Sequence, residues 1–424
     1  MLTADQNEML TRIGPGTPMG TMMRRYWMPV APAADLDEKW TKRVRLLGED
    51  LVLFRDRQGR RGLIGEYCPH RRASFLHGIP SQEGIRCPYH GWEFNREGTC
   101  LDQPNEPEKQ AFKDKVKTAA YPVQELGGML FAYMGPPETM PLLPRYDGFV
   151  AEGAVRMLGR ALIPVNWLQI MENSADPIHT EWLHGHHYEF LKEQEGIKVA
   201  ISAHHEKIDF KEFEFGMTKH RLLVGQKETV EDWTVGHPIV FPIMLAVGNG
   251  DRHLRSYAFQ IRVPVDDTHT LHYWYTAYQP QDPSRIPAHL QGKLFQYEVP
   301  IHDKDGNFLV ETVDNQDIMA WITQGAIADR TLENLGSTDQ GIAVYRRMLR
   351  RELKKVEQGL DPMGTLRDPA RNVSIDLPNE KDKHHFSDGF GAFLMRTHGR
   401  FSPIAQDLID IFETPKDPTL RLVG

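Results

Sequence analysis

The sequence has few cysteines, no long apolar run and no excess of basic charge, and each absence excludes a class of protein. Three cysteines among 424 residues are too few for a disulfide framework. No stretch approaches the ~18 consecutive apolar residues of a transmembrane helix. A formal net charge of −8 argues against nucleic-acid binding. The opening residues, MLTADQNEML, lack the basic and apolar regions of a signal peptide. We therefore expect a cytoplasmic protein that does not span a membrane.

Two of the three cysteines stand in short clusters with histidine. Cys68-Pro-His70 and Cys87-Pro-Tyr-His90 are separated by sixteen residues. A Cys2His2 zinc site, the alternative, usually pairs like ligands as C-x2-C and H-x3–5-H. One Cys and one His from each cluster is instead the ligand set of a Rieske 2Fe–2S centre, in which two thiolates hold one iron and two imidazoles hold the other. The spacing therefore predicts a one-electron centre and leaves Cys100 as a structural thiol.

The pattern along the chain predicts an α+β protein of more than one domain, as its length also suggests. Residues 1–35 form an N-terminal helical segment in this interpretation. Residues 36–134 form a small all-β Rieske domain, with the Cys/His clusters on neighbouring loops at its tip. Residues 135–424 form a catalytic domain, which begins with the Pro-rich linker GPPETMPLLP. We expect this linker to be the boundary between the two domains.

Two hairpins and a basic helix are predicted within these domains. RVRLLGEDLVLFRD (43–56) has an extended run on either side of a Gly-containing turn. SYAFQIRVPV (256–265) alternates, placing Tyr257 and every second residue on one face, and LHYWYTAY (271–278) follows it as a second strand. The basic stretch YRRMLRRELKK (345–355) is interpreted as a solvated helix face rather than as a binding site.

A second metal site is indicated by the pattern N-x2-D-x2-H-x4-H, which is formed by Asn173, Asp176, His179 and His184. Two histidines and one carboxylate on one face of Fe(II) form a facial triad that leaves positions for O2 and substrate. Asp176-Pro177 is equally a good helix start, with Asp as the N-cap and Pro at the first helical position.

Both the second imidazole and the carboxylate ligand have rivals in the sequence. His186 and His187 compete with His184 as imidazole ligands. The third ligand has to come from elsewhere in the chain, and spacing alone does not choose among the acids of one later segment. These acids are Glu311, Asp314, Asp317 and Asp329.

Four blocks of sequence together resemble the Rieske non-haem iron aromatic oxygenases. The blocks are QNEMLTRIGPGTPMGTMMRRYWMPVA, YCPHRRASFLHG with CPYHGWEFN, NWLQIMENSADPIHTEWLHG, and QD followed by QGAIADRTLENLGSTDQGI. Within this family they look like the phthalate 4,5-dioxygenase group and the related 5,5′-dehydrodivanillate O-demethylases. The resemblance covers most of the chain, and its motifs are specific for the family but not for a substrate.

The resemblance assigns roles to individual residues. Cys68, His70, Cys87 and His90 match the cluster ligands, and His179, His184 and Asp317 match the ligands of the mononuclear iron. Asp176 matches the acid that links a Rieske histidine of one subunit to an iron-bound histidine of the next. Asn173, in the same motif, is assigned with Asp176 to the catalytic machinery. This link implies a homo-oligomer, a trimer or a hexamer, because the two metals of one subunit are expected to lie too far apart. The implied catalytic domain is a curved antiparallel sheet flanked by helices around an apolar pocket.

The function that follows is a terminal oxygenase acting on an aromatic substrate and O2. No G-x-G-x-x-G segment follows a strand, so we expect a separate reductase or ferredoxin to bring electrons from NADH or NADPH. O-demethylation of a lignin-derived methoxylated aromatic such as 5,5′-dehydrodivanillate is the preferred reaction, and cis-dihydroxylation of a carboxylate such as phthalate is the alternative. Arg252 or Arg255 is a candidate partner for a substrate carboxylate. A Rieske ferredoxin or a respiratory Rieske subunit does not account for the 135–424 segment.

Overall fold

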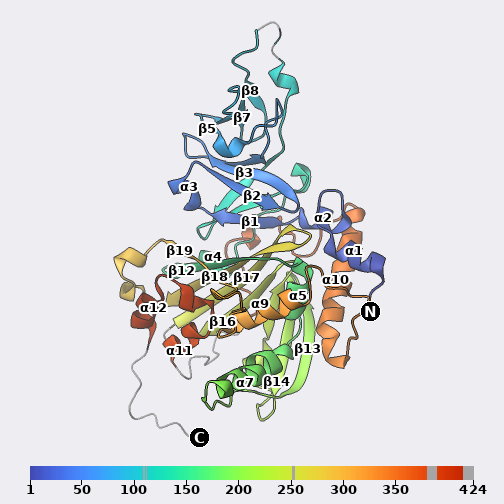
Figure 1. Ribbon diagram of the computed structural model, residues 1–424, viewed down its shortest axis with the longest axis vertical. Helices are drawn as coiled ribbons and strands as arrows, with labels where there is room; N and C mark the ends of the chain where they lie inside the picture. The colour runs from blue at the N-terminus through green and yellow to red at the C-terminus, as the bar shows by residue number, and fades with distance from the viewer. Residues whose placement is uncertain (108–109, 111, 251–253, 380–388, 414–424) are drawn as a thin grey trace.

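The structure, a computed structural model, has the α+β architecture predicted from the sequence. In Figure 1 small β-sheets occupy the narrow upper part of the molecule, and a large sheet with most of the helices forms the broad lower part. Among the residues described, no helix is long and apolar enough to cross a membrane. The structure describes residues 1–107, 110, 112–250, 254–379 and 389–413.

The upper part contains two four-stranded antiparallel sheets. The first has the order β2-β3-β4-β9, and the second has the order β5-β6-β7-β8. The hairpin predicted around Gly48 is confirmed: β2 and β3 pair up to Leu46 and Glu49, and Leu47 and Gly48 between them both have positive φ, as a two-residue hairpin turn requires. The strands are β2 (Thr41–Leu46), β3 (Glu49–Arg55), β4 (Arg61–Gly65), β9 (Ala120–Tyr121), β5 (Ile79–Pro80), β6 (Gly84–Arg86), β7 (Glu93–Asn95) and β8 (Cys100–Asp102).

A three-stranded sheet lies between the upper sheets and the lower part of the molecule (Figure 1). In it β1 (Trp27–Pro32) pairs with β11 (Met129–Tyr133), which also pairs with β10 (Val123–Leu126). Every residue of β1 and β11 is buried, because both strands belong to a hydrophobic core that continues into the large sheet. Residues about 100 positions apart in the sequence thus join the two parts of the molecule.

The lower part is built on an eight-stranded sheet of order β13-β14-β15-β16-β17-β18-β12-β19. All its neighbouring strands are antiparallel except β12 and β19, which are parallel, so the expected antiparallel sheet is in fact mixed at one edge. The second predicted hairpin is confirmed as β17 paired with β18. The strands are β12 (Val155–Ile163), β13 (His205–Phe213), β14 (Gly216–Leu223), β15 (His237–Val240), β16 (Met244–Gly250), β17 (Leu254–Asp266), β18 (His269–Pro280) and β19 (Leu294–Glu298).

The two faces of β17 have different surroundings. Tyr257, Phe259, Ile261 and Val263 are buried in the main hydrophobic core, as their alternation predicts. The residues between them, Ser256, Ala258 and Gln260, line a cavity on the opposite face. The sheet therefore packs on the core with one face and forms the wall of a site with the other.

The helices cover the cavity side and the ends of the large sheet. The predicted solvated basic helix is only half exposed: it lies in α10, where Arg346 is buried and pairs with Glu172 of α5 at 2.6 Å. The α-helices are α1 (Ala4–Thr11), α2 (Pro18–Met23), α3 (Asp35–Glu38), α4 (Asp147–Val150), α5 (Trp167–Ser174), α6 (His179–Glu181), α7 (His187–Gln194), α8 (Glu231–Thr234), α9 (Val313–Thr323), α10 (Gln340–Glu357), α11 (Phe390–Met395) and α12 (Ala405–Phe412). A π-helix, η4 (Trp182–His186), joins α6 to α7. The 3₁₀ helices are η1 (Phe75–His77), η2 (Lys113–Lys115), η3 (Pro137–Thr139), η5 (Pro283–Arg285), η6 (Ala288–Leu290), η7 (Ser337–Asp339), η8 (Pro369–Arg371) and η9 (His398–Phe401).

Candidate active site

The two Cys/His clusters come together in the upper part of the molecule. Cys68 and His70 follow β4, and Cys87 and His90 lie between β6 and β7. Both thiols are buried, and the imidazole rings of His70 and His90 lie with their centroids 4.5 Å apart. The His70 ring also stacks on Trp92 at 4.4 Å, which fixes its orientation. Folding has therefore brought all four predicted cluster ligands to one place.

The polar atoms of these four residues fit a 2Fe–2S cluster. The Nδ1 atoms of both His70 and His90 are buried without a hydrogen-bond partner among the described residues. Such orphaned atoms are costly unless something binds them. Burial, with the adjacent Cys87 thiol, raises the pKa of Cys68 to about 12. Because iron stabilises thiolates, two buried sulfurs beside two free imidazole nitrogens form the mixed donor set that such a cluster needs.

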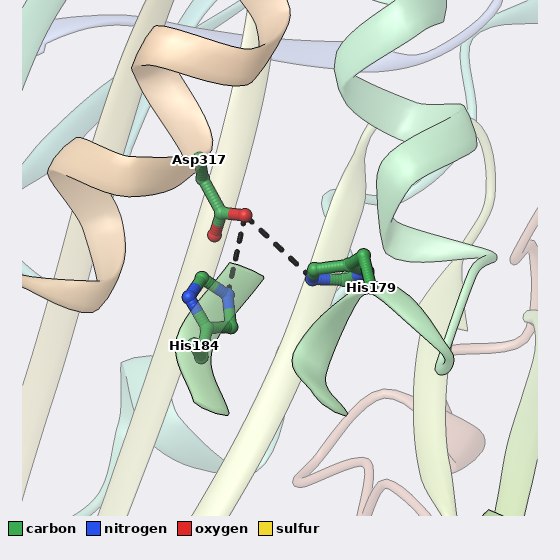
Figure 2. Close-up of side chains that lie close together, drawn as sticks. All are labelled: His179, His184 and Asp317. Atoms are coloured by element: carbon green, nitrogen blue, oxygen red, sulfur yellow. Dashed lines mark ion pairs between the residues drawn. The ribbon is translucent and has the colours of Figure 1, made fainter. Parts of the chain in front are cut away.

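A second donor set lies in the lower part, where His179, His184 and Asp317 converge (Figure 2). One ligand atom from each residue lies within 4.8 Å of the others. Asp317 Oδ1 is 3.6 Å from His179 Nε2 and 3.3 Å from His184 Nε2. The histidines come from α6 and η4, whereas Asp317 comes from α9. Two imidazoles and one carboxylate on one side of a common point match a facial Fe(II) triad.

A π-helical turn explains how histidines five residues apart share a face. In an α-helix, five residues rotate the side chain by about 500°, so it ends about 140° away from its starting direction. The π-helix has a wider turn, closed here by the bond from the His187 N–H to the Trp182 carbonyl. Gly185, within this turn, packs closely against the backbone of Ser202, because a Cβ at residue 185 would lie 2.9 Å from Ser202 Cα. The H-x4-H spacing is thus matched to the wider turn.

The hydrogen bonds of the two rings direct their Nε2 lone pairs towards the metal position. His179 Nδ1 donates to the carbonyl oxygen of Asp176 at 2.5 Å, and His184 Nδ1 donates to Gln316 Oε1 at 2.9 Å. Because Nδ1 carries the proton in each ring, Nε2 is left as the acceptor that a metal requires. Gln316 is held in turn by its Nε2, which donates to the Val310 carbonyl.

Burial and charge set the protonation states of the triad. Burial lowers the pKa of His179 to about 3, although Asp317 acts in the opposite direction. Burial would also lower the pKa of His184, but Asp317 reverses this and the net shift is upward. For Asp317 burial acts to raise the pKa, and the two histidines and Arg262 outweigh it. The site therefore combines a neutral imidazole with an ionised carboxylate, as a metal site requires.

Asn173 and Asp176 both contact this centre. Asn173 Nδ2 lies 3.5 Å from Asp317 Oδ1, the oxygen that faces both histidines. Asp176 Oδ2 lies 3.8 Å from His179 Nδ1 and its side chain remains partly exposed. The predicted helix start is displaced, since α6 begins at His179 with Ile178 as its N-cap. Asp176 nevertheless accepts a bond from the Ile178 N–H at 2.8 Å, so it stabilises the turn before the helix.

The structure separates the rival ligands from the triad. His186 pairs with Glu189 at 3.5 Å instead. Asp314, one turn before Asp317 on α9, accepts a hydrogen bond from the His398 N–H. His187, Glu311 and Asp329 are likewise outside the cluster of metal-binding groups found among the described residues. The choice of Asp317, made from the resemblance, is the one that the geometry favours.

A cavity of about 270 Å³ opens beside the triad. Its apolar wall residues are Leu245, Val247, Ala258, Val313 and Phe393, and most of its other lining residues are polar. Of the arginines suggested for a substrate carboxylate, Arg252 lies outside the described residues. Arg255 contacts the Tyr257 hydroxyl at 3.1 Å and is not among the residues that line the cavity.

The sequence-based interpretation missed the residues that shape this cavity. They include Lys219 and Arg221 of β14, which line the cavity. The interpretation also missed Gln316, which orients His184. Gln316 could have been found from its position next to Asp317. Lys219 and Arg221 have no comparable sequence signal, because the face of β14 that borders the cavity depends on how the whole sheet packs.

Known proteins resemble the chain over most of its length. Residues 26–122 match the family model of the Rieske [2Fe-2S] domain, and residues 287–376 match that of the LigXa C-terminal domain like family. The 5,5′-dehydrodivanillate O-demethylase oxygenase subunit of Sphingobium sp. (strain NBRC 103272 / SYK-6) is 42% identical over 382 residues, 89% of this chain and 87% of that protein. The phthalate 4,5-dioxygenase oxygenase subunit of Pseudomonas putida is 33% identical over 419 residues, 90% of this chain and 93% of that protein.

A solved structure shows the same fold. The terminal oxygenase of carbazole 1,9a-dioxygenase from Nocardioides aromaticivorans IC177 superposes with a TM-score of 0.60 at 18% identity, covering 82% of this chain and 97% of that one. This structure shows the fold, and the two relatives described above show the family. The chain belongs to the Rieske non-haem iron oxygenases, as an oxygenase subunit for aromatic compounds with a 2Fe–2S cluster and a mononuclear iron site.

Proposed function

We propose that this protein is the terminal oxygenase in the O-demethylation of a lignin-derived methoxylated aromatic such as 5,5′-dehydrodivanillate. The observation that carries this proposal is the 42% identity to a dehydrodivanillate O-demethylase subunit over 89% of the chain. The match of residues 287–376 to the LigXa C-terminal family adds support from the catalytic part of the chain. Hydroxylation of the methoxy carbon gives a hemiacetal, which releases formaldehyde and leaves a phenol.

In this proposal the metal ligands are those predicted from the sequence. Cys68, Cys87 and the Nδ1 atoms of His70 and His90 hold the cluster, which a separate reductase or ferredoxin supplies with electrons. His179 Nε2, His184 Nε2 and a carboxylate oxygen of Asp317 hold the iron. When bound, the cluster delivers single electrons and the iron supplies the O2 chemistry that side chains lack.

We further propose that Asp176 connects the two centres across a subunit interface. Its backbone carbonyl orients the iron-ligating His179, and its carboxylate is partly exposed. The cluster loops lie in the upper part of the molecule, whereas α9, which carries Asp317, lies in the lower part (Figure 1). A cluster from a neighbouring subunit is therefore the proposed donor, in a homotrimer or a homohexamer. Asn173 is proposed to position the Asp317 carboxylate.

The cavity walls are proposed to seat the aromatic ring. Leu245, Val247 and Phe393 offer apolar surface and exclude water from the reacting carbon. Asn173 holds one oxygen of Asp317 from the helix α5 side. The ring would thus lie between the sheet and the triad, with its methoxy group towards the metal position.

Cis-dihydroxylation of an aromatic carboxylate such as phthalate is the second candidate. It is favoured by the 33% identity to a phthalate 4,5-dioxygenase subunit over 90% of this chain. The same triad and cavity serve both reactions, because the outcome depends on which substrate atom lies at the iron.

A single turnover distinguishes the two reactions. Dithionite-reduced protein is mixed with O2 and either 5,5′-dehydrodivanillate or phthalate, and products are identified by mass. Loss of one methyl group with release of formaldehyde supports the demethylase, and a dihydrodiol from phthalate would replace it with the dioxygenase. Iron analysis should give about three iron atoms per chain, two for the cluster and one for the triad.

A further inference from the structure

Lys219 is a buried cation in the wall of the active-site cavity, and it forms no ion pair with the residues that the structure describes. It lies on β14 with 8% of its surface exposed and lines the cavity. Among the described residues its ammonium group makes no hydrogen bond and no ion pair. A buried ammonium group normally has a partner, since burying a charge without one is costly. Lys219 therefore occupies a position that a bound anion would stabilise.

The neighbouring charged groups are already engaged. Arg221, two residues along the same strand, lies 3.5 Å from Asp232 and donates to Thr180 Oγ1 at 3.2 Å. Asp317 faces the two histidines of the triad. Asp314 accepts a hydrogen bond from the His398 N–H. Of the two described cations of β14 in the cavity wall, Arg221 thus has an acidic partner and Lys219 has none, although Arg221 Nε also makes no hydrogen bond.

The surroundings of Lys219 lower its pKa but leave it charged at neutral pH. Burial lowers its pKa to about 8, and Arg221 and Arg262 act in the same direction, while Asp176 and Asp317 oppose them. A group with this pKa carries its proton in most molecules at pH 7. The charge is therefore available for a ligand at the pH at which the enzyme is expected to work.

Gln260 provides a second donor on the same face of the sheet. Arg262 donates to the Gln260 backbone carbonyl at 2.9 Å and to its Oε1 at 2.7 Å. Because a guanidinium can only donate, the side-chain oxygen of Gln260 is fixed on Arg262 and its amide nitrogen is left to donate to a ligand. The cavity wall thus offers hydrogen-bond donors from two strands, separated by the apolar side chains of β16.

We propose that Lys219 Nζ binds the carboxylate of an aromatic acid and thereby selects aromatic carboxylates as the substrate class of this cavity. Gln260 Nε2 donates to an oxygen substituent elsewhere on the same ligand. The proposal rests on the proposed function only in taking this cavity as the substrate site. Lys219, which faces the cavity, thus takes the role of carboxylate partner that the sequence analysis suggested for Arg252 or Arg255.

The test compares carboxylates with their neutral amides on the holoenzyme. Dissociation constants are measured by calorimetry, without turnover, for 5,5′-dehydrodivanillate and phthalate and for the diamide of each. In the Lys219→Met variant we expect carboxylate binding to weaken roughly 10- to 100-fold, the range of one charged hydrogen bond. Amide binding should change less than about threefold, because no charge pair is lost. Lys219→Arg should retain part of the affinity for the carboxylate.

Two controls separate binding from folding. Lys211→Met removes an exposed lysine of β13 and should leave both constants unchanged. Lys219→Met removes an uncompensated buried charge, so its thermal midpoint should equal or exceed that of the wild type. Equal losses for carboxylates and amides, or a wild type that binds neither carboxylate more tightly than its amide, would overturn the role of Lys219.

This outcome is independent of the reaction type. If phthalate yields a dihydrodiol and its binding depends on Lys219, the demethylase proposal fails and the carboxylate site stands. If 5,5′-dehydrodivanillate and its diamide bind equally well and both release formaldehyde, the demethylase stands and the carboxylate site fails.

Discussion

At the scale of single residues, the iron site depends on atoms that do not touch the metal position. Each ligating imidazole is held by a hydrogen bond from Nδ1, to a backbone carbonyl for His179 and to Gln316 Oε1 for His184. The backbone acceptor is present whatever the side chain of residue 176 is. The side-chain acceptor, in contrast, can be removed by a single substitution.

Replacing Gln316 with Leu should weaken iron binding without removing a ligand. His184 would lose the acceptor that fixes its tautomer, and we expect a 10- to 100-fold loss of iron affinity, the usual effect of removing such a partner. Competition with a chelator measures this, with Gln324→Leu on the exposed end of α9 as the control. The cluster absorbance should be unchanged, and an unaltered iron affinity would contradict the role given to Gln316.

Replacing Asp176 with Asn should preserve both metal centres and nearly abolish turnover. The His179 bond to the backbone carbonyl of residue 176 is retained, and Asn can still accept from the Ile178 N–H. Only the carboxylate charge is lost, and with it the proposed coupling of the two centres. Iron analysis together with steady-state rates measures both properties, and fast turnover with full iron would exclude the proposed link.

Some of these residues can be recognised from neighbouring sequence, whereas others depend on contacts between distant segments. The four cluster ligands and His179 follow from residue type and short spacing, whereas His184 was separated from His186 and His187 by the resemblance. The Asp317 ligand lies 133 positions after His184, and spacing alone could not separate it from Asp314, one turn away on the same helix. Lys219 was not predicted at all, because its place in the cavity wall, without an ion pair to any described residue, depends on residues from several strands.

At the scale of secondary-structure elements, the π-helix η4 sets the direction of the His184 side chain, and the helix α4 buries the Asp147 carboxyl group. The π-helical turn brings His184 to the same side as His179. In an α-helix, which has a narrower turn, the H-x4-H spacing would not place the two side chains on one side. In α4, Asp147 is buried where the chain meets residues 375–377, and it accepts from the N–H groups of Gly148 and Leu377.

Asp147 should make stability depend on pH. Burial raises its pKa from the ordinary 3.8 to about 6, so the folded protein holds a proton that the unfolded chain has released. The stabilisation from this proton is complete below pH 3.8 and is lost as the pH rises through 6. The difference between the two pKa values corresponds to roughly 3 kcal/mol.

Asp147→Asn, which is neutral at every pH, should therefore melt at a higher temperature than the wild type at pH 8, and the gain should shrink at pH 5. Scanning fluorimetry at a fixed heating rate measures this, with the exposed Asp114→Asn as the control. A difference between variant and wild type that is the same at both pH values would show that Asp147 is not the group responsible.

At the scale of the whole molecule, the separation of the upper cluster loops from the lower iron triad has a testable consequence (Figure 1). We expect two inactive variants to complement each other when co-expressed, Cys87→Ser without the cluster and Asp317→Ala without the mononuclear iron. In random mixed rings, a subunit with a cluster precedes one with an iron site in roughly a quarter of the positions, so activity should approach about a quarter of the wild type.

The control mixes the two purified variants without exchange of subunits, and it should remain inactive. If electrons pass within one chain, the co-expressed mixture stays inactive as well. Native mass spectrometry of the same sample reports whether mixed oligomers have formed and how many subunits they contain. The division of the chain at residues 35 and 134 stays a prediction that limited proteolysis can examine.

Local sequence patterns were enough to predict the mixed Cys/His ligands, the iron ligand His179, the hairpins and the α+β class. These follow from side-chain type and from spacing over a few residues, which the local backbone preserves. The resemblance selected His184 and Asp317 from their rivals, and the structure supports this choice by bringing both residues to His179. The packing of the sheet was needed to show which face of β17 borders the cavity and that Lys219 forms no ion pair with the described residues there. Such features arise from contacts between distant segments, because burial and the sum of surrounding charges are properties of the packed molecule.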